Sequence, residues 1–171
     1  MTARSALAHR ATDLERLEAV EIPFLTQLAV RAEPATVAAL GFPVDPNTAA
    51  YGTGWDLLWL GPDEWLVVAD PGNAVASAAA LEGSLAGGHH SVVDVSANRA
   101  VLELRGAGRH ELLASACPLD LHRRAWGEGR CAQTLFGAAP VLLQERLGAT
   151  RVFVRPSFAG YVVDLLRSAA A

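Results

Sequence analysis

Both cysteines of the chain lie in one arginine-rich segment, ACPLDLHRRAWGEGRCAQ, which spans residues 116–133. Thiolates act as metal ligands, redox partners or nucleophiles, so this segment has the residue types for chemistry. A structural zinc site takes four ligands, usually presented in close pairs such as CxxC or HxxxH. Cys117 and Cys131 are separated by thirteen residues, and His122 is the only histidine between them. We therefore predict that this segment binds no metal ion.

The same two cysteines are predicted to be structural rather than catalytic. Pro118 directly follows Cys117, and Cys131 opens an apolar strand, where small cysteines are usually buried. Because the chain has two cysteines, an acidic composition and no apparent secretory signal, we expect a cytoplasmic protein with reduced thiols. No run of eighteen apolar residues occurs, so we expect no membrane partner.

Motifs for other chemistries are missing or incomplete. No GxSxG nucleophile elbow occurs, and a Walker A loop is excluded because the chain has fourteen arginines and no lysine. The stretch GAGRHE (106–111) has a glutamate where a dinucleotide-binding loop needs its third glycine, so we interpret it as a strand–turn–helix junction. Acidic residues interrupt the arginines, which disfavours nucleic-acid binding. We predict no catalytic and no cofactor-binding residue in this chain.

Hydrophobic periodicity predicts an α+β fold. Strands are expected at residues 24–32, 55–70 (a hairpin), 90–96, 99–106, 131–137, 139–147 and 150–157. Helices are expected at residues 33–42, 71–88, 108–116 and 158–170. Short helices between antiparallel hairpins predict ferredoxin-like β-α-β-β layers, in which an antiparallel sheet carries its helices on one face. We expect residues 1–20 to form an N-terminal arm and residues 21–171 to form a single domain built of two similar halves.

Two apolar faces can be predicted in more detail. In the last helix, apolar residues at helical spacing predict a buried face formed by Phe158, Tyr161, Val162, Leu165 and Leu166. In the first arm of the hairpin, strand alternation places Trp55 and Trp59 on one face, which we expect to lie in the core. The segment between the first helix and this hairpin, residues 43–54, is expected to be a turn-rich linker.

Charge is unevenly distributed along the chain. Residues 11–94 carry twelve acidic residues against two arginines, whereas residues 95–171 carry ten arginines against six acidic residues. Such a separation of charge can steer a molecule onto a larger charged partner. A surface that is merely solvated explains the same pattern, so the charges alone leave both interpretations open.

Three segments resemble the gamma subunit of heterotetrameric sarcosine oxidase, namely LWLGPDEWLVVAD, VVDVSANRAVLELRGAGRHELLASACPLDLHRRAWGEGRCAQTLFGAAPVLL and VFVRPSFAGYVVDLL. The resemblance implies alpha, beta and delta subunits as partners. It also implies oxidative demethylation of sarcosine to glycine, with peroxide formation and transfer of the one-carbon unit to tetrahydrofolate. FAD, FMN and NAD would be held by the two large subunits, and zinc by the delta subunit. The implied fold is similar to the folate-binding domain of the glycine-cleavage aminomethyltransferase.

Two hypotheses of different class follow. In the first, the chain is a non-catalytic subunit that braces the flavin-bearing chains. In the second, it is a folate-binding or aminomethyl-transferring module with its own pocket, for which Asp94 would supply the carboxylate. The hypotheses differ in whether Asp94 lines an accessible apolar pocket or caps the turn at Ser96 and Asn98.

Under the first hypothesis, the loop from His122 to Arg130 is predicted to dock against one of the large subunits. Tryptophan and arginine are the residue types most enriched among binding hot spots. The polar neighbours of Trp126, and the glycines at 127 and 129, make a buried position for its ring hard to arrange, so we expect the ring to be exposed. The predicted interface comprises His122, Arg123, Arg124, Trp126 and Arg130.

Overall fold

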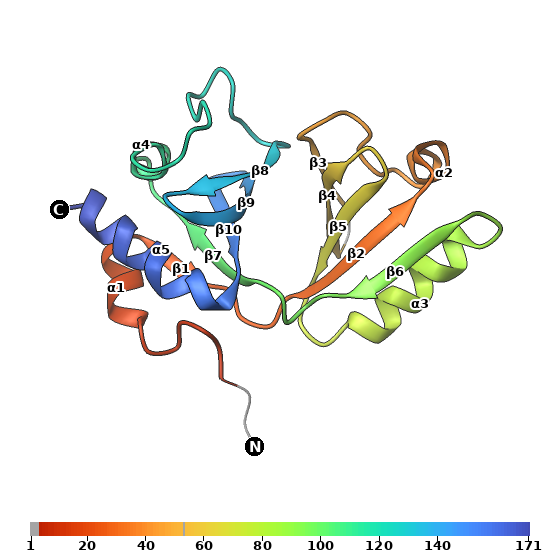
Figure 1. The fold of residues 1–171 in the computed structure, drawn as a ribbon, viewed down its shortest axis with the longest axis horizontal. Coiled ribbons are helices and arrows are strands. Elements are labelled where there is room, and N and C mark those ends of the chain that lie inside the picture. The colour runs from red at the N-terminus through yellow and green to blue at the C-terminus, as the bar shows by residue number, and fades with distance from the viewer. Residues whose placement is uncertain (1–3, 53) are drawn as a thin grey trace. The chain divides into compact units, whose positions relative to one another are not determined.

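The structure is a computed structural model that describes residues 4–52 and 54–171. The described chain divides into two compact units. Unit 1 contains residues up to 23 together with residues 98–171, and unit 2 contains residues 24–97. Each unit has one five-stranded antiparallel sheet with short helices (Figure 1). The predicted α+β fold class is therefore confirmed.

Unit 2 has the ferredoxin-like arrangement that the periodicity predicts. Its elements are β2 (Thr26–Ala32), α2 (Pro34–Ala39), β3 (Ala49–Tyr51), β4 (Trp55–Gly61), β5 (Glu64–Ala69), α3 (Ala74–Leu85) and β6 (His90–Asp94). The sheet order is β3-β4-β5-β2-β6, so the core of the unit is a β-α-β-β-α-β motif with β3 added at one edge. Strand β3 lies within the segment expected to be a linker, because three residues are too few to show alternation.

The core of unit 2 is built around Trp65, which is fully buried. Phe42 packs edge-on against its ring at a centroid distance of 5.9 Å, and its indole nitrogen donates a hydrogen bond to the Pro43 carbonyl at 2.7 Å. Trp55 and Trp59 are half-buried and pack against the same apolar cluster. The prediction that these two tryptophans share a core-facing side of the strand is confirmed.

Unit 1 contains the remaining elements. They are α1 (Ala11–Arg16), β1 (Ala19–Glu21), β7 (Ala100–Leu104), α4 (Arg109–Ala114), β8 (Cys131–Phe136), β9 (Ala139–Arg146), β10 (Ala149–Val154) and α5 (Pro156–Ala169). The sheet order is β1-β7-β10-β9-β8, with all neighbours antiparallel. The helices contribute to one apolar cluster with alternate residues of the strands. Within the described residues, no helix has the length and apolar character needed to cross a membrane.

The sequence leads us to expect an N-terminal arm over residues 1–20, and the part of this segment that the structure describes packs in unit 1. Leu7, Leu14 and Leu17 are buried in the unit 1 cluster. Strand β1 pairs with β7, and the carboxylate of Glu21 accepts hydrogen bonds from the Ser5 hydroxyl at 2.7 Å and the Leu7 amide at 3.2 Å. The three-residue strand carries too short a pattern to be recognised from sequence, yet it completes the sheet edge.

Helix α5 buries a face slightly rotated from the predicted one. Its fully buried residues are Ala159, Val162, Val163 and Leu166. Tyr161 lies at the rim of this face and remains 39% exposed. Its hydroxyl accepts a hydrogen bond from the Ala138 amide at 3.1 Å, in the turn between β8 and β9. This bond holds the Tyr161 side chain at the rim of the buried face.

Candidate functional site

The residues predicted to form an interface lie in the loop between α4 and β8, which we call the α4–β8 loop (residues 115–130). It is the segment between these two labels in Figure 1. Loops of this length without regular structure are uncommon in compact domains and usually have a function. Its backbone is nevertheless ordered by local hydrogen bonds. The Asp120 carboxylate accepts from the His122 amide at 2.9 Å, and the His122 carbonyl accepts from the amides of Ala125 and Trp126.

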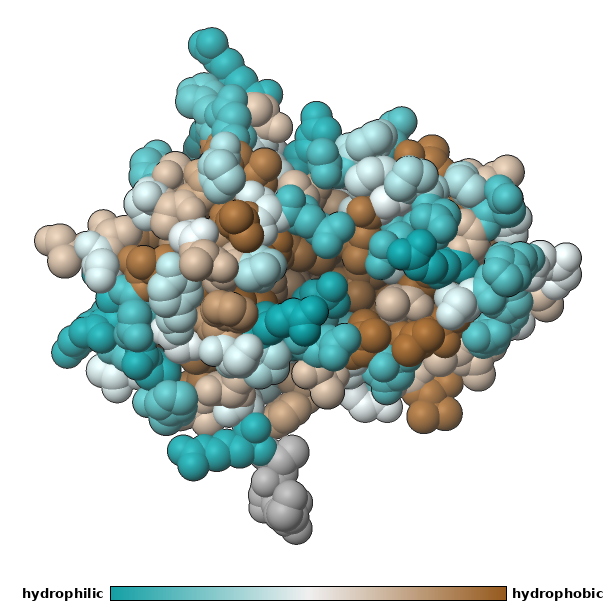
Figure 2. Space-filling view, viewed as in Figure 1, coloured by the Kyte–Doolittle hydropathy of each residue, from teal (hydrophilic) through white to brown (hydrophobic). Residues whose placement is uncertain are grey.

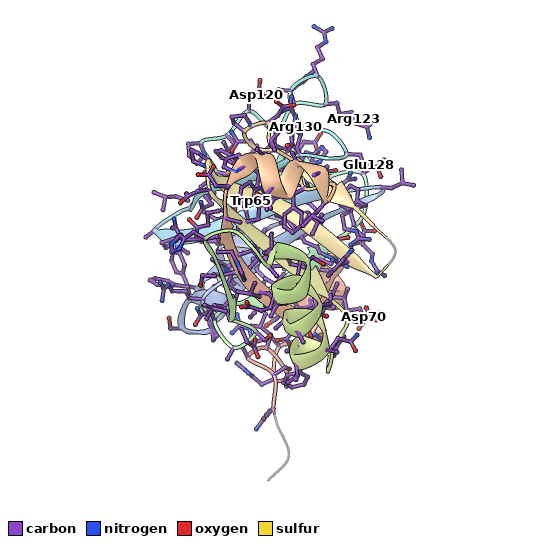
Figure 3. The ribbon with its side chains drawn as sticks, turned by 90° about the vertical axis from the view of Figure 1, so that its right-hand side faces the viewer. Trp65, Asp70, Asp120, Arg123, Glu128 and Arg130 are labelled. Atoms are coloured by element: carbon purple, nitrogen blue, oxygen red, sulfur yellow. The ribbon has the colours of Figure 1, made fainter. Side chains whose placement is uncertain are left out.

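The outer side of the α4–β8 loop is positively charged. His122, Arg123, Arg124 and Arg130 are all exposed, as predicted. Among residues 4–52 and 54–171, none of these three guanidinium groups forms an ion pair. The outer end of the loop is hydrophilic in the space-filling view (Figure 2), and Figure 3 shows Arg123, Glu128 and Arg130 along it. Unpaired arginines on an ordered loop can bind carboxylates of another surface through bidentate hydrogen bonds.

Trp126 does not belong to this exposed side, so the expectation that its ring projects into solvent is wrong. The residue is only 5% exposed and lies in the unit 1 core cluster, as does Leu121. Its indole nitrogen donates a hydrogen bond to the Glu145 carboxylate at 3.0 Å. The turn at His122 directs the ring inward while the arginines on either side point outward. Trp126 is thus a support of the loop rather than a contact surface.

The acceptor of this bond, Glu145, is a buried carboxylate with four side-chain donors. Oε1 accepts from Arg109 Nη2 at 2.6 Å and from His110 Nε2 at 3.1 Å. Oε2 accepts from Trp126 Nε1 and from the Thr150 hydroxyl. Arg109 is itself held by the Gly106 carbonyl at 3.0 Å. A buried charge is tolerated when it is paired and hydrogen-bonded, and Glu145 meets both conditions.

Sequence analysis did not select Glu145, Arg109 or His110, although a signal for the glutamate is present. In the strand APVLLQERL, alternation places Glu145 on the same face as Val141 and Leu143. Val141 and Leu143 both face the core, so the carboxylate of Glu145 must be buried too. A glutamate at a core position requires cationic or polar partners, and this requirement points to a buried network.

Both cysteines are buried and neither forms a disulfide within the described residues, and burial is what the sequence predicted for structural thiols. Cys131 is fully buried, and the Cys117 sulfur lies 3.9 Å from the Thr134 hydroxyl. In the part of the chain that the structure describes, no three His, Cys, Asp or Glu side chains are grouped so that they could hold a metal ion. The cysteine segment therefore contributes packing at its two ends and a charged loop between them.

Asp94, the carboxylate considered for a folate pocket, caps a turn. Its Oδ1 accepts hydrogen bonds from the Ser96 amide at 2.9 Å and from the Ser96 hydroxyl. The bond from the Ser96 hydroxyl, and to a smaller extent the bond from the Ser96 amide, lower the pKa of the Asp94 carboxyl below its usual range. The hydroxyl of Ser96 also accepts from the Gln27 amide at 3.0 Å, which ties the turn to β2. The sequence left two roles open for Asp94, lining a pocket or capping a turn, and in the structure it caps the turn.

Two of the surface cavities of the described chain are the following. One, of about 470 Å³ in unit 1, is lined by Arg16, Glu18, Arg105, Arg109, Glu111 and apolar neighbours. The other, of about 250 Å³ in unit 2, lies beside Arg31, Asp63 and His90. The Gly88 carbonyl and the Glu82 carboxylate raise the pKa of the His90 imidazole. Neither cavity is lined by Asp94 or by residues of the α4–β8 loop.

Comparison with known proteins gives concordant results for sequence and structure. A model of the sarcosine oxidase gamma subunit family matches residues 27–171. The gamma subunit of sarcosine oxidase from an Arthrobacter species is 41% identical over 145 residues, which cover 80% of this chain and 70% of the relative.

The solved structures give the same result. A chain of heterotetrameric sarcosine oxidase from Corynebacterium sp. U-96, solved with pyrrole 2-carboxylate, is 36% identical with a TM-score of 0.87, and the match covers 98% of this chain and 94% of that one. The aminomethyltransferase T of the glycine cleavage system from Bartonella henselae is 17% identical with a TM-score of 0.68, over 91% of this chain and 47% of that one. The second match shows a shared fold, which agrees with the fold expected from the resemblance.

Proposed function

The chain belongs to the sarcosine oxidase gamma subunit family, and we propose that it is the non-catalytic gamma subunit of a four-subunit complex with alpha, beta and delta partners. The observation that carries this proposal is the match to a chain of the heterotetrameric enzyme, which extends over nearly the whole length of both chains. The role of the chain is to brace the subunits in which the chemistry takes place.

In this proposal the cofactors belong to the partners. FAD, FMN and NAD are bound by the two large subunits, zinc by the delta subunit, and tetrahydrofolate receives the one-carbon unit within the complex. Together they oxidise sarcosine to glycine and reduce oxygen to peroxide. The cysteine thiols of the described chain form no disulfide, which suits the reducing conditions of the cytoplasm, where we place the complex.

The surface proposed to contact a large subunit is the outer side of the α4–β8 loop, with His122, Arg123, Arg124 and Arg130. Exposed guanidinium groups without ion-pair partners have the most to gain from carboxylates on another surface. The loop's internal hydrogen bonds reduce the conformational entropy that is lost on binding. We therefore expect the partner to present an acidic face to this loop.

Reconstitution of the four subunits tests this proposal. Arg123→Glu/Arg124→Glu reverses two charges of the loop and should weaken the affinity of the gamma subunit for the remaining subunits by about tenfold or more, or about 1.4 kcal/mol. Arg16→Glu/Arg155→Glu makes the same charge change at two exposed arginines of unit 1 outside the loop and should leave the affinity within about twofold. Equal effects of the two double variants would contradict docking through the loop. Turnover of sarcosine by the isolated chain would contradict the non-catalytic role.

A further inference from the structure

We propose that Glu145 is the positioning residue of the docking surface, because its buried carboxylate holds the α4–β8 loop in the form that presents its arginines. This inference rests on the docking role proposed above. It identifies the residue that holds the loop in the conformation needed for docking. Glu145 itself is 2% exposed and does not contact a partner directly. It acts through Trp126 and through the backbone of the loop.

Glu145 holds the loop at two separate points. Its carboxylate accepts from the indole nitrogen of Trp126 in the second half of the loop, at 3.0 Å. Its backbone amide donates to the carbonyl of Arg130 at the end of the loop, at 2.8 Å. Between these two points lie Gly127, Glu128 and Gly129, and the Arg130 amide closes a turn onto the Gly127 carbonyl at 3.1 Å. One residue of β9 therefore sets the path of the segment that precedes β8.

The four hydrogen bonds described above engage both oxygens of the carboxylate. A carboxylate accepts about four hydrogen bonds, two at each oxygen. Here Arg109 and His110 of α4 fill one oxygen, and Trp126 together with Thr150 of β10 fills the other. The donors come from a helix, a strand and the loop, so the carboxylate links three parts of unit 1 that are distant in sequence. Loss of the carboxylate would leave these buried donors without their acceptor, which is unfavourable.

A glutamine at this position cannot replace the carboxylate. If its amide oxygen faces Arg109 and His110, its NH₂ group faces the N–H of Trp126, and two donors oppose each other. If the amide is flipped, the NH₂ group instead faces the guanidinium of Arg109. Either orientation removes one side of the network while the volume of the side chain is kept. Glu145→Gln therefore tests the hydrogen-bond geometry without creating a cavity.

The test compares Glu145→Gln with Glu103→Gln in the reconstituted four-subunit complex. Glu103 is a matched control because it is also buried, lies in the same sheet and is held by two arginines, with Arg105 Nη2 at 2.7 Å and Arg151 Nε at 3.1 Å. It has no contact with the α4–β8 loop among the bonds described above. We expect Glu145→Gln to weaken assembly by about tenfold and Glu103→Gln by less than about twofold.

A second readout reports the loop directly. In the isolated chain, the indole N–H proton of Trp126 should exchange with solvent faster in Glu145→Gln than in the wild type, and at an unchanged rate in Glu103→Gln. If exchange is accelerated but assembly is unaffected, positioning by Glu145 is overturned, whereas docking still stands if Arg123→Glu/Arg124→Glu weakens assembly. If the arginine variant also assembles normally, docking itself fails.

Trp126→Phe keeps the test decisive if Glu145→Gln does not fold. Phenylalanine keeps an aromatic ring in the core but is smaller than the indole and lacks its N–H donor, so assembly should weaken at least threefold while the circular dichroism spectrum is kept. Where both single variants fold, we also compare the double variant Glu145→Gln/Trp126→Phe. Its affinity for the remaining subunits should equal that of the single variant with the larger loss, because both changes break the same bond. Additive losses, or unchanged assembly of Trp126→Phe, would overturn the proposal.

Discussion

The indole nitrogen of Trp126 donates a hydrogen bond to the carboxylate of Glu145 at 3.0 Å, between a loop whose sequence is polar and a strand whose sequence is apolar. Each residue is the exception in its own segment. Trp126 is buried, although the arginines near it in the sequence are exposed. Glu145 is a charged residue type in a strand whose other core-facing residues include valine and leucine. This pairing separates two tasks within the loop: one side chain fixes it, and its neighbours present charge.

Replacement of Trp126 by alanine should destabilise the isolated chain by about 3–5 kcal/mol, because it leaves a cavity in the unit 1 core. The loss also removes one donor from Glu145. Urea denaturation of the isolated chain measures the effect, with Arg124→Ala as the surface control that should stay within about 0.5 kcal/mol of the wild type. A loss below about 1 kcal/mol for Trp126→Ala would show that the ring is not part of the core in solution.

Assembly should weaken as salt is added. Between about 0.1 M and about 1 M salt the screening length falls from roughly 10 Å to roughly 3 Å, so attraction between the loop arginines and an acidic face is progressively screened. Arg123→Ala/Arg124→Ala should lower affinity at low salt and flatten this dependence. Surface plasmon resonance with the immobilised partner subunits provides the measurement. Salt dependence that is the same for wild type and variant would place the electrostatic contacts elsewhere.

Gly137→Ala should destabilise unit 1 more than Gly148→Ala. Both glycines have positive φ angles, +57° and +76°, where a Cβ atom is unfavourable by about 1–2 kcal/mol. A Cβ at Gly137 would also lie 2.5 Å from the Tyr161 hydroxyl oxygen, whereas one at Gly148 would meet nothing within 4 Å. The two variants thus separate backbone strain from collision. Equal midpoints in urea denaturation would mean that α5 moves aside at no cost.

Acid should remove a stabilising contribution of Glu103. Burial raises the pKa of this carboxyl, but hydrogen bonds and charge from Arg105 and Arg151 outweigh the burial, so its pKa in the folded chain is lowered. The contribution is therefore present above the unfolded pKa, about 4.3, and is lost as the pH falls through the lower folded value. Free energies of unfolding measured across this pH range should fall less steeply for Glu103→Gln than for the wild type. Parallel curves would contradict the assignment.

Most regular elements were predictable because their patterns are local. The alternation in residues 55–70 predicts the β4–β5 hairpin, and the helical spacing in residues 158–170 predicts α5, with an error only in which flank of the helix is buried. Strands β1 and β3 could not be predicted, since each has three residues and depends on a neighbouring strand for its hydrogen bonds. Strand pairing between segments distant in sequence produces no hydrophobic periodicity that could be recognised in three residues.

The candidate site divides in the same way. The exposure of His122, Arg123, Arg124 and Arg130 follows from the sequence, because polar and charged side chains in a glycine-containing loop have no local alternative to solvent. The position of Trp126 depends on the tertiary fold, because its hydrogen-bond partner lies nineteen residues away in the chain and on another element. A loop has no periodicity that assigns its side chains to an inner or an outer face. The inner face of this loop is defined by the free energy of satisfying one buried carboxylate, and that requirement exists only after β9, β10 and α4 have come together.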